Sequence, residues 1–135
     1  MKNNVKFEEY ENMLREWSGR MNLVAPSTLN DIKTRHIADS AQLADVLPHD
    51  VHVIDLGSGA GFPAVVLAIL GWNVTCIESI GKKVAFLSAV KEKLKEKNIP
   101  IIAEDTGLNY GRTVIISAET GMYTIKAVGK PVKEI

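Results

Sequence analysis

The apolar residues of the chain recur in two different patterns. From residue 7 to residue 21 they stand three or four positions apart, which is typical of one face of an amphipathic helix; they are Phe7, Tyr10, Leu14, Trp17 and Met21. In residues 51–56, 73–78 and 99–105 they form short runs rich in β-branched residues, which are typical of buried strands. Residues 64–70 and 81–98 have a helical pattern and separate these runs. This alternation predicts an α/β fold with a parallel sheet.

Further elements follow from the same patterns. A second helix is predicted to begin at Thr28-x-x-Asp31, which resembles a capping box, and to end before Pro48. Its apolar positions are Ile32, Ile37, Ala41, Ala44 and Leu47. The buried face of the helix over residues 81–98 should carry Val84, Leu87, Val90 (or Lys91) and Leu94. Near the end of the chain, residues 113–119 and 123–128 are predicted strands, and Glu119-Thr120-Gly121 fits a hairpin turn between them.

The strand of residues 51–56 leads into three alternating glycines, and this stretch predicts a ligand site. Asp55 stands at the end of the strand, Gly57, Gly59 and Gly61 follow, and Pro63 opens the next helix. Such a unit places backbone N–H groups and a helix N-terminus at the carboxyl end of a parallel strand. Doubly wound sheets bind their ligands there.

The glycine spacing distinguishes two classes of cofactor. Dinucleotide-binding loops follow G-x-G-x-x-G, whereas here the third glycine comes one residue early and Phe62 stands where that pattern has glycine. An acidic residue followed by G-x-G-x-G is the methyltransferase form of the loop, which surrounds the methionine part and the ribose of S-adenosylmethionine (SAM). A nicotinamide-dependent oxidoreductase and a tight turn without a ligand stay as alternatives.

Glu78 favours the SAM interpretation. It ends the strand of residues 73–78 and follows Gly57 by 21 residues. This is close to the spacing of about 20 residues at which a carboxylate at a strand end accepts hydrogen bonds from ribose hydroxyls.

Composition limits the remaining possibilities. The chain has 135 residues, enough for one domain with a core, and a formal net charge of zero, so any contact with RNA must come from a local patch. Its single cysteine, Cys76, is expected to be a small core residue. A single cysteine cannot form a disulfide within the chain, which suits the cytoplasm. We find no signal peptide, and the longest apolar run, residues 62–72, is too short to cross a bilayer. A monomer without a membrane partner or a metal ion is expected.

Four motifs in order resemble one family. They are Trp17-Ser18-x-x-Met21-Asn22-Leu23, Arg35-His36-x-x-Asp39-Ser40, the stretch from Asp55 to Pro63, and Glu78-Ser79-x-x-Lys82-Lys83-x-x-Phe86-Leu87. Together they resemble the RsmG (also called GidB) family, especially its alphaproteobacterial members, over residues 7–105. The resemblance implies a Rossmann-like class I SAM-dependent methyltransferase sheet with N-terminal helices. It also implies methylation of guanine N7 in 16S ribosomal RNA, with SAM as cofactor and small-subunit ribosomal RNA as partner.

The resemblance and the loop together assign candidate site residues. Those expected to bind the cofactor are Asp55, Gly57, Ser58, Gly59, Gly61, Phe62, Glu78, Ser79, Glu104 and Asp105. Those expected to contact RNA are Arg15, Arg20, Arg35, His36, Lys82 and Lys83. His36 and Asp39 share a helix face, and a structural pair is favoured over a catalytic one. No catalytic residue is assigned, because guanine N7 carries a lone pair and no proton.

After Asp105 the resemblance ends. Ser117 is kept, but Ala118 stands where family members have arginine, and the later strands of the family are incomplete. We therefore expect one domain over residues 1–135, made of an N-terminal helical extension (1–48), a SAM-binding core (49–105) and a divergent tail (106–135). Two functions stay open at this point: an active methyltransferase, and a shortened SAM-binding remnant with little or no activity.

Overall fold

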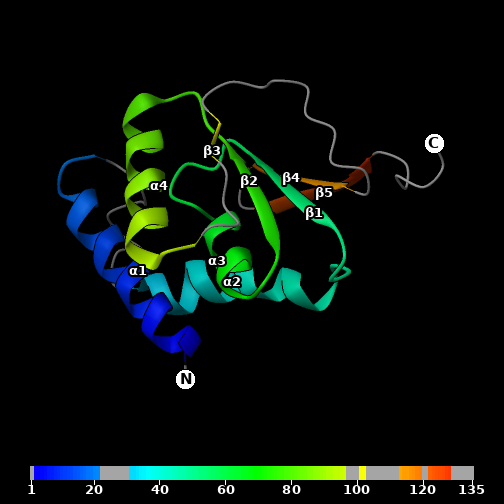
Figure 1. The fold of residues 1–135 in the computed structure, drawn as a ribbon, viewed down its shortest axis with the longest axis horizontal. Coiled ribbons are helices and arrows are strands. Elements are labelled where there is room, and N and C mark those ends of the chain that lie inside the picture. The colour runs from blue at the N-terminus through cyan, green and yellow to red at the C-terminus, as the bar shows by residue number, and fades with distance from the viewer. Residues whose placement is uncertain (1, 22–30, 97–100, 103–112, 120–121, 129–135) are drawn as a thin grey trace.

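The computed structural model describes residues 2–21, 31–96, 101–102, 113–119 and 122–128. These residues form helices and strands that alternate along the chain (Figure 1). The elements are α1 (Lys2–Ser18), the π-helix η2 (Ile32–Ile37), α2 (Ala38–Ala41), the 3-10 helix η3 (Gln42–Asp45), β1 (His52–Leu56), α3 (Ala64–Ile69), β2 (Asn73–Ile77), α4 (Gly81–Leu94), β3 (Ile101–Ile102), β4 (Thr113–Glu119) and β5 (Met122–Val128). None of the helices in the described part of the chain is long and apolar enough to cross a membrane.

The strands form one sheet in the order β3-β2-β1-β4-β5. Strand β1 pairs in parallel with β2 on one side and with β4 on the other, and β2 pairs in parallel with β3. Strand β5 runs antiparallel to β4, with Glu119 opposite Met122. A connection this short can join antiparallel strands only, since a parallel return needs a long crossover. The predicted α/β class and the predicted hairpin are both confirmed.

One face of the sheet is packed against helix α3. The register places Val53 beside Val74, and Asp55 beside Cys76 and Ile116, so these five side chains share that face. All six residues of α3 are buried, as expected for a helix that is apolar all round. Cys76 is fully buried, and burial raises the pKa of its thiol from 9.0 to about 12, which confirms the prediction of a core residue.

Helices α1 and α4 pack side by side in opposite directions (Figure 1). The ring of Trp17 near the end of α1 meets that of Phe86 in the first half of α4, with centroids 5.5 Å apart. At the other end, Lys6 forms an ion pair with Glu96, just beyond α4. The end of α1 therefore lies beside the start of α4.

The predicted apolar stripe of the first helix is largely confirmed. Tyr10 and Leu14 are fully buried, and Phe7 and Trp17 pack against the core. Met21 lies outside the helix, which ends at Ser18.

Helix α4 differs from its prediction at two places. Phe86 is buried and Val84 is only partly buried, because α4 packs on α1 as well as on the sheet and needs a wider apolar face. The helix ends at Leu94 instead of residue 98, since Lys95 adopts a left-handed conformation with φ of 57°. The N–H groups of Lys95 and Glu96 then bond back to the carbonyls of Glu92 and Lys91, which satisfies the last turn.

The second predicted helix is helical but not uniform. Its residues are divided among η2, α2 and η3, and Ile37, Leu43 and Leu47 turn inward as buried residues. Arg35 and Asp39 are exposed on the other side. The polar motif of this segment is therefore divided: Arg35 and Asp39 lie at the surface, His36 is partly buried, and Ser40 is fully buried.

Candidate cofactor site

The glycine loop lies at the carboxyl ends of the two central strands. It leaves β1 after Leu56 and returns at once to the neighbouring strand, because the N–H groups of Gly57 and Ser58 donate to the carbonyl oxygen of Ile77 at 2.8 and 3.3 Å. Ile77 is the last residue of β2. The loop thus occupies the edge at which parallel sheets bind ligands.

Gly57 and Gly59 form the open half of the loop. Both have positive φ, 68° and 53°, which L-residues rarely adopt. A Cβ on Gly57 would meet nothing within 4 Å, and one on Gly59 would make only ordinary contacts, the nearest with the Gly57 carbonyl oxygen at 3.7 Å. On this side the backbone is open to a ligand.

Glu78 joins the open half of the loop to the segment that leads into α4. Its side chain is only 5% exposed; Oε1 accepts a hydrogen bond from the N–H of Gly59 at 2.7 Å and Oε2 accepts one from the N–H of Ile80 at 3.0 Å. A carboxylate oxygen can accept two hydrogen bonds, so each keeps one acceptor position. Ser79 lies exposed beside it.

Asp55 holds the other end of the loop. It is 1% exposed, and its Oδ2 accepts a hydrogen bond from the N–H of Ala64, in the first turn of α3, at 3.1 Å. Burial raises the pKa of Asp55 well above its ordinary value of 3.8, and the charge of Glu78 adds to this rise, while the bond from Ala64 opposes it. The buried hydroxyl of Ser58 donates to the Asp55 carbonyl oxygen at 2.9 Å. Asp55 therefore links strand, loop and helix.

Gly61 belongs to a second, packed half of the loop. A Cβ at Gly61 would lie 2.6 Å from Cγ2 of Val65 and 2.9 Å from the hydroxyl of Tyr10. That hydroxyl donates to the carbonyl oxygen of Ala60 at 2.5 Å, so α1 is fastened to the loop. Sequence reasoning assigned Tyr10 to core packing only. The available signal was a tyrosine at a buried position, because a buried tyrosine hydroxyl usually has a hydrogen-bond partner.

Phe62 lies between two aromatic side chains from different helices. Its ring centroid is 5.5 Å from that of Tyr10, and 5.1 Å from that of His36, to which it is stacked at an interplanar angle of 25°. Burial lowers the pKa of His36 from 6.5; the charge of Arg35 lowers it further, and that of Asp39 raises it. The predicted structural pair of His36 and Asp39 stays a prediction.

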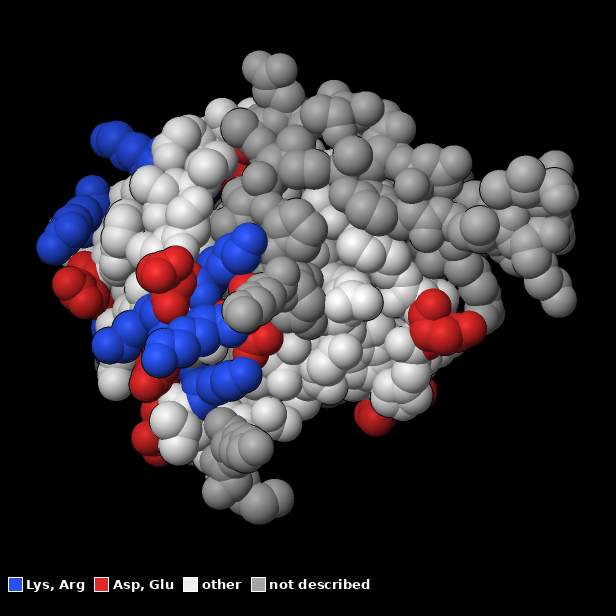
Figure 2. All heavy atoms as spheres, in the orientation of Figure 1, with Lys and Arg blue, Asp and Glu red and all other residues white. Residues whose placement is uncertain are grey.

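Four of the six predicted RNA contacts fall into two groups. Arg15 and Arg20 each pair with the glutamate four residues earlier, at 2.9 and 3.7 Å. Lys82 and Lys83 lie in the first turn of α4, and within the described residues they join no ion pair. Because α1 and α4 are antiparallel, Arg20 lies at the same end of the helix pair as these lysines. Figure 2 shows basic and acidic side chains intermingled on the side where α1 and α4 lie.

Two candidates cannot be placed. Glu104 and Asp105 lie outside the described residues, as does the rest of the strand predicted over residues 99–105 apart from Ile101–Ile102. Their assignment to the cofactor stays a prediction.

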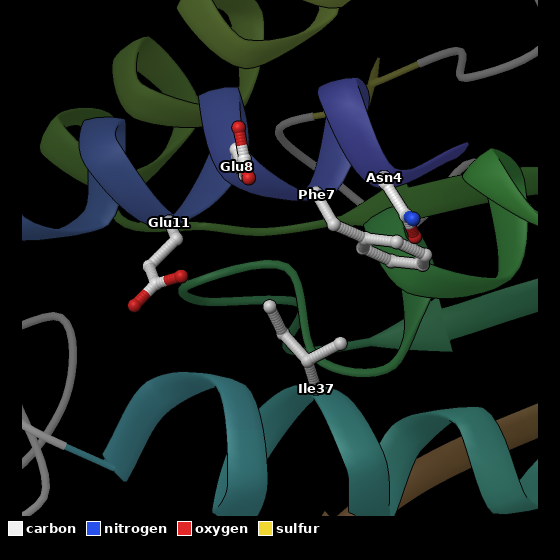
Figure 3. Close-up of a pocket in the computed structure, with 5 residues that line it drawn as sticks. All are labelled: Asn4, Phe7, Glu8, Glu11 and Ile37. Carbon is white, nitrogen blue, oxygen red and sulfur yellow. The ribbon is translucent and has the colours of Figure 1, made fainter. Parts of the chain in front are cut away.

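A cavity that the sequence did not predict separates α1 from η2. It has a volume of about 130 Å³ and is lined by Asn4, Phe7, Glu8, Glu11 and Ile37. Figure 3 shows Phe7 and Glu11 pointing from α1 toward Ile37. Two carboxylates at this cavity would repel RNA phosphates, so it is a poor extension of an RNA surface.

Comparison with known proteins places the chain in one family. The model of the GidB family, described as rRNA small subunit methyltransferase G, matches residues 3–129. This match continues beyond Asp105, where the motif-based resemblance ended.

Curated relatives bear the name ribosomal RNA small subunit methyltransferase G. One from Rhodopseudomonas palustris is 44% identical over 114 residues, 80% of this chain and 50% of the relative. One from Rhodospirillum centenum is 59% identical over 83 residues, 60% of this chain and 38% of the relative. One from Orientia tsutsugamushi is 48% identical over 99 residues, 72% of this chain and 50% of the relative. The chain spans about half the length of these relatives or less, and it belongs to the GidB family of small-subunit rRNA methyltransferases.

Proposed function

We propose that the chain binds SAM and transfers its methyl group to guanine N7 of 16S ribosomal RNA. The observation that carries this proposal is the open half of the glycine loop beside the buried carboxylate of Glu78. Family membership supports the type of reaction and the class of substrate. Ribosomal RNA is made in the cytoplasm, and we infer that the chain acts there.

The open half of the loop suits the methionine end of SAM. Gly57 and Gly59 present bare backbone to the space above them, so a ligand can approach it closely. The remaining acceptor positions of Glu78 suit the ribose hydroxyls, since hydroxyl donors form short, strong hydrogen bonds with an ionised acceptor. Ser79 lies exposed next to this carboxylate and is a further candidate contact.

The reaction needs no general base from the chain. Bound SAM would supply the methyl group. The N7 lone pair of guanine would form the new N–C bond as the C–S bond of the sulfonium breaks, which would leave the electron pair on sulfur as a neutral thioether and the positive charge on N7-methylguanine. The protein has to align the three atoms and exclude water, which is catalysis by positioning.

The RNA surface is proposed at the end of the helix pair where Arg20, Lys82 and Lys83 lie. The turn from Glu78 to Ile80 leads directly into this end, so phosphate bound there would be close to the cofactor. Arg35, exposed on η2, is an additional candidate. Arg15, which lies in α1 five residues before Arg20, is another.

The function is tested by measuring binding and turnover on one sample. Calorimetry gives the affinity for SAM, and mass spectrometry of small-subunit RNA digested to nucleosides after incubation with chain and SAM detects N7-methylguanosine. Both signals are expected. Binding of SAM without methylation would favour the shortened SAM-binding remnant, and absence of SAM binding would overturn the proposal.

The RNA surface has its own test. Replacing Lys82 and Lys83 by alanine should reduce the slope of log affinity against log salt by about one to two, because each phosphate contact contributes nearly one. The matched control replaces the exposed Lys93 and Lys95 at the other end of α4, which should leave the slope unchanged. Equal effects of the two double substitutions would contradict this location.

A further inference from the structure

The stack of His36 on Phe62 connects two parts of the molecule that the sequence separates. Phe62 follows directly after the packed half of the glycine loop, and His36 lies near the end of η2. The two rings are 5.1 Å apart and nearly parallel, at 25°. The other neighbour of Phe62, Tyr10, is fully buried and is bonded to the loop at Ala60. The loop is therefore held from two sides, by α1 and by η2.

The contact from η2 matters because the space between η2 and α1 is not filled. The cavity lined by Phe7, Glu11 and Ile37 lies between the two helices, and Ile37 directly follows His36 in the chain. Stacked rings resist sliding and tilting more than an aliphatic contact of the same area does, since their faces have a preferred geometry. The His36 ring thus fixes how far Phe62, and the backbone of Gly61 before it, can move.

We propose that His36 is a positioning residue for the cofactor loop, which acts through Phe62 to hold Gly59 and Gly61 in the geometry that binds SAM. This role differs from the RNA contact that the family resemblance implies for the same residue. This positioning role depends on the proposed function at one point only, namely that the ligand is SAM. Its neighbour Arg35, exposed on η2, keeps the predicted role of contacting RNA.

The test compares three variants of the full chain at a temperature where each is folded. His36→Ala removes the ring and should weaken SAM binding about 3- to 10-fold, the range for losing one aromatic pair. His36→Phe keeps a stacking ring and should restore affinity to within about 2-fold. The matched control, Leu43→Ala, removes a buried side chain of η3 and should lower the melting temperature without changing SAM affinity. His36→Ala should leave the salt dependence of RNA binding unchanged.

Hydrogen exchange gives a measurement that needs no ligand. In His36→Ala the amides of Gly59 and Gly61, bonded to Glu78 and to the Ser58 carbonyl, should exchange about tenfold faster, while those of Val53 and Val74 in the sheet keep their rates. Unchanged loop exchange, or no rescue by phenylalanine, would overturn the inference. If His36→Ala speeds loop exchange as expected but the wild-type chain binds no SAM, the proposed function alone would be overturned.

Discussion

Glycine serves opposite purposes in the two halves of the glycine loop. In the open half, Gly57 and Gly59 face space that a side chain could enter, and the loop is tied there to Glu78. In the packed half, Gly61 lies against Val65 and Tyr10, where a side chain cannot fit. The alternating glycines therefore do not form one ligand-binding strip. One half leaves room for the ligand, and the other lets the loop pack tightly on the protein.

The largest effect should come from Gly61→Ala. The new Cβ would overlap Val65 and Tyr10 in addition to the strain of its φ of 92°, so the free energy of unfolding should fall by about 2–5 kcal/mol. The control Gly57→Ala has strain but no overlap and should lose about 1–2 kcal/mol. Urea denaturation of both variants measures the difference. Equal losses would show that the loop is not divided in this way.

Glu78→Ala should mainly weaken the binding of the cofactor. Loss of its hydrogen bonds to the ligand should weaken SAM binding by about 1–3 kcal/mol, measured by calorimetry. The control Glu92→Ala removes an exposed glutamate from α4 and should leave the affinity unchanged. Wild-type affinity in the Glu78 variant would remove this residue from the site.

Tyr10→Phe tests the packed half with the loss of one oxygen atom. The ring contact with Phe62 stays, but the buried Ala60 carbonyl loses its donor, which should reduce the free energy of unfolding by about 1 kcal/mol. Denaturation at neutral pH measures this, and Tyr10→Ala should lose more because the ring is removed as well. A stability equal to wild type in Tyr10→Phe would mean that the hydrogen bond contributes nothing to holding the loop.

The last prediction concerns pH. The pKa of Asp55 is raised on folding, so its contribution to stability is fully present below the unfolded value near 3.8 and is lost as pH rises through the folded pKa. Asp55→Asn lacks this titration, and the stability of wild type relative to the variant should decline as pH rises above 3.8. Denaturation midpoints of both proteins across this range measure the trend. A relative stability that increases with pH would contradict the raised pKa.

Much of the geometry of the candidate cofactor site could be predicted because its signals are local. The position of the loop after a buried strand, and that of Glu78 at the end of the next strand, follow from patterns within a few residues. In the structure the N–H of Gly59 donates to Oε1 of Glu78, since pairing of β1 with β2 brings the carboxyl ends of the two strands together. For Glu104 and Asp105 the cofactor contact stays a prediction, because both lie outside the described residues.

The sequence by itself determined the order of helices and strands, the glycine loop and the acidic residue beside it. Each depends on hydrophobic periodicity or on backbone preferences that act between near neighbours. Only the tertiary structure decided which glycine faces open space and which is packed, that Tyr10 bonds to the loop, and that His36 stacks on Phe62. It also brought Arg20 to the end of α4 that carries Lys82 and Lys83. These contacts join residues that are far apart in the chain. They depend on how whole helices and strands pack together, which no local sequence pattern encodes.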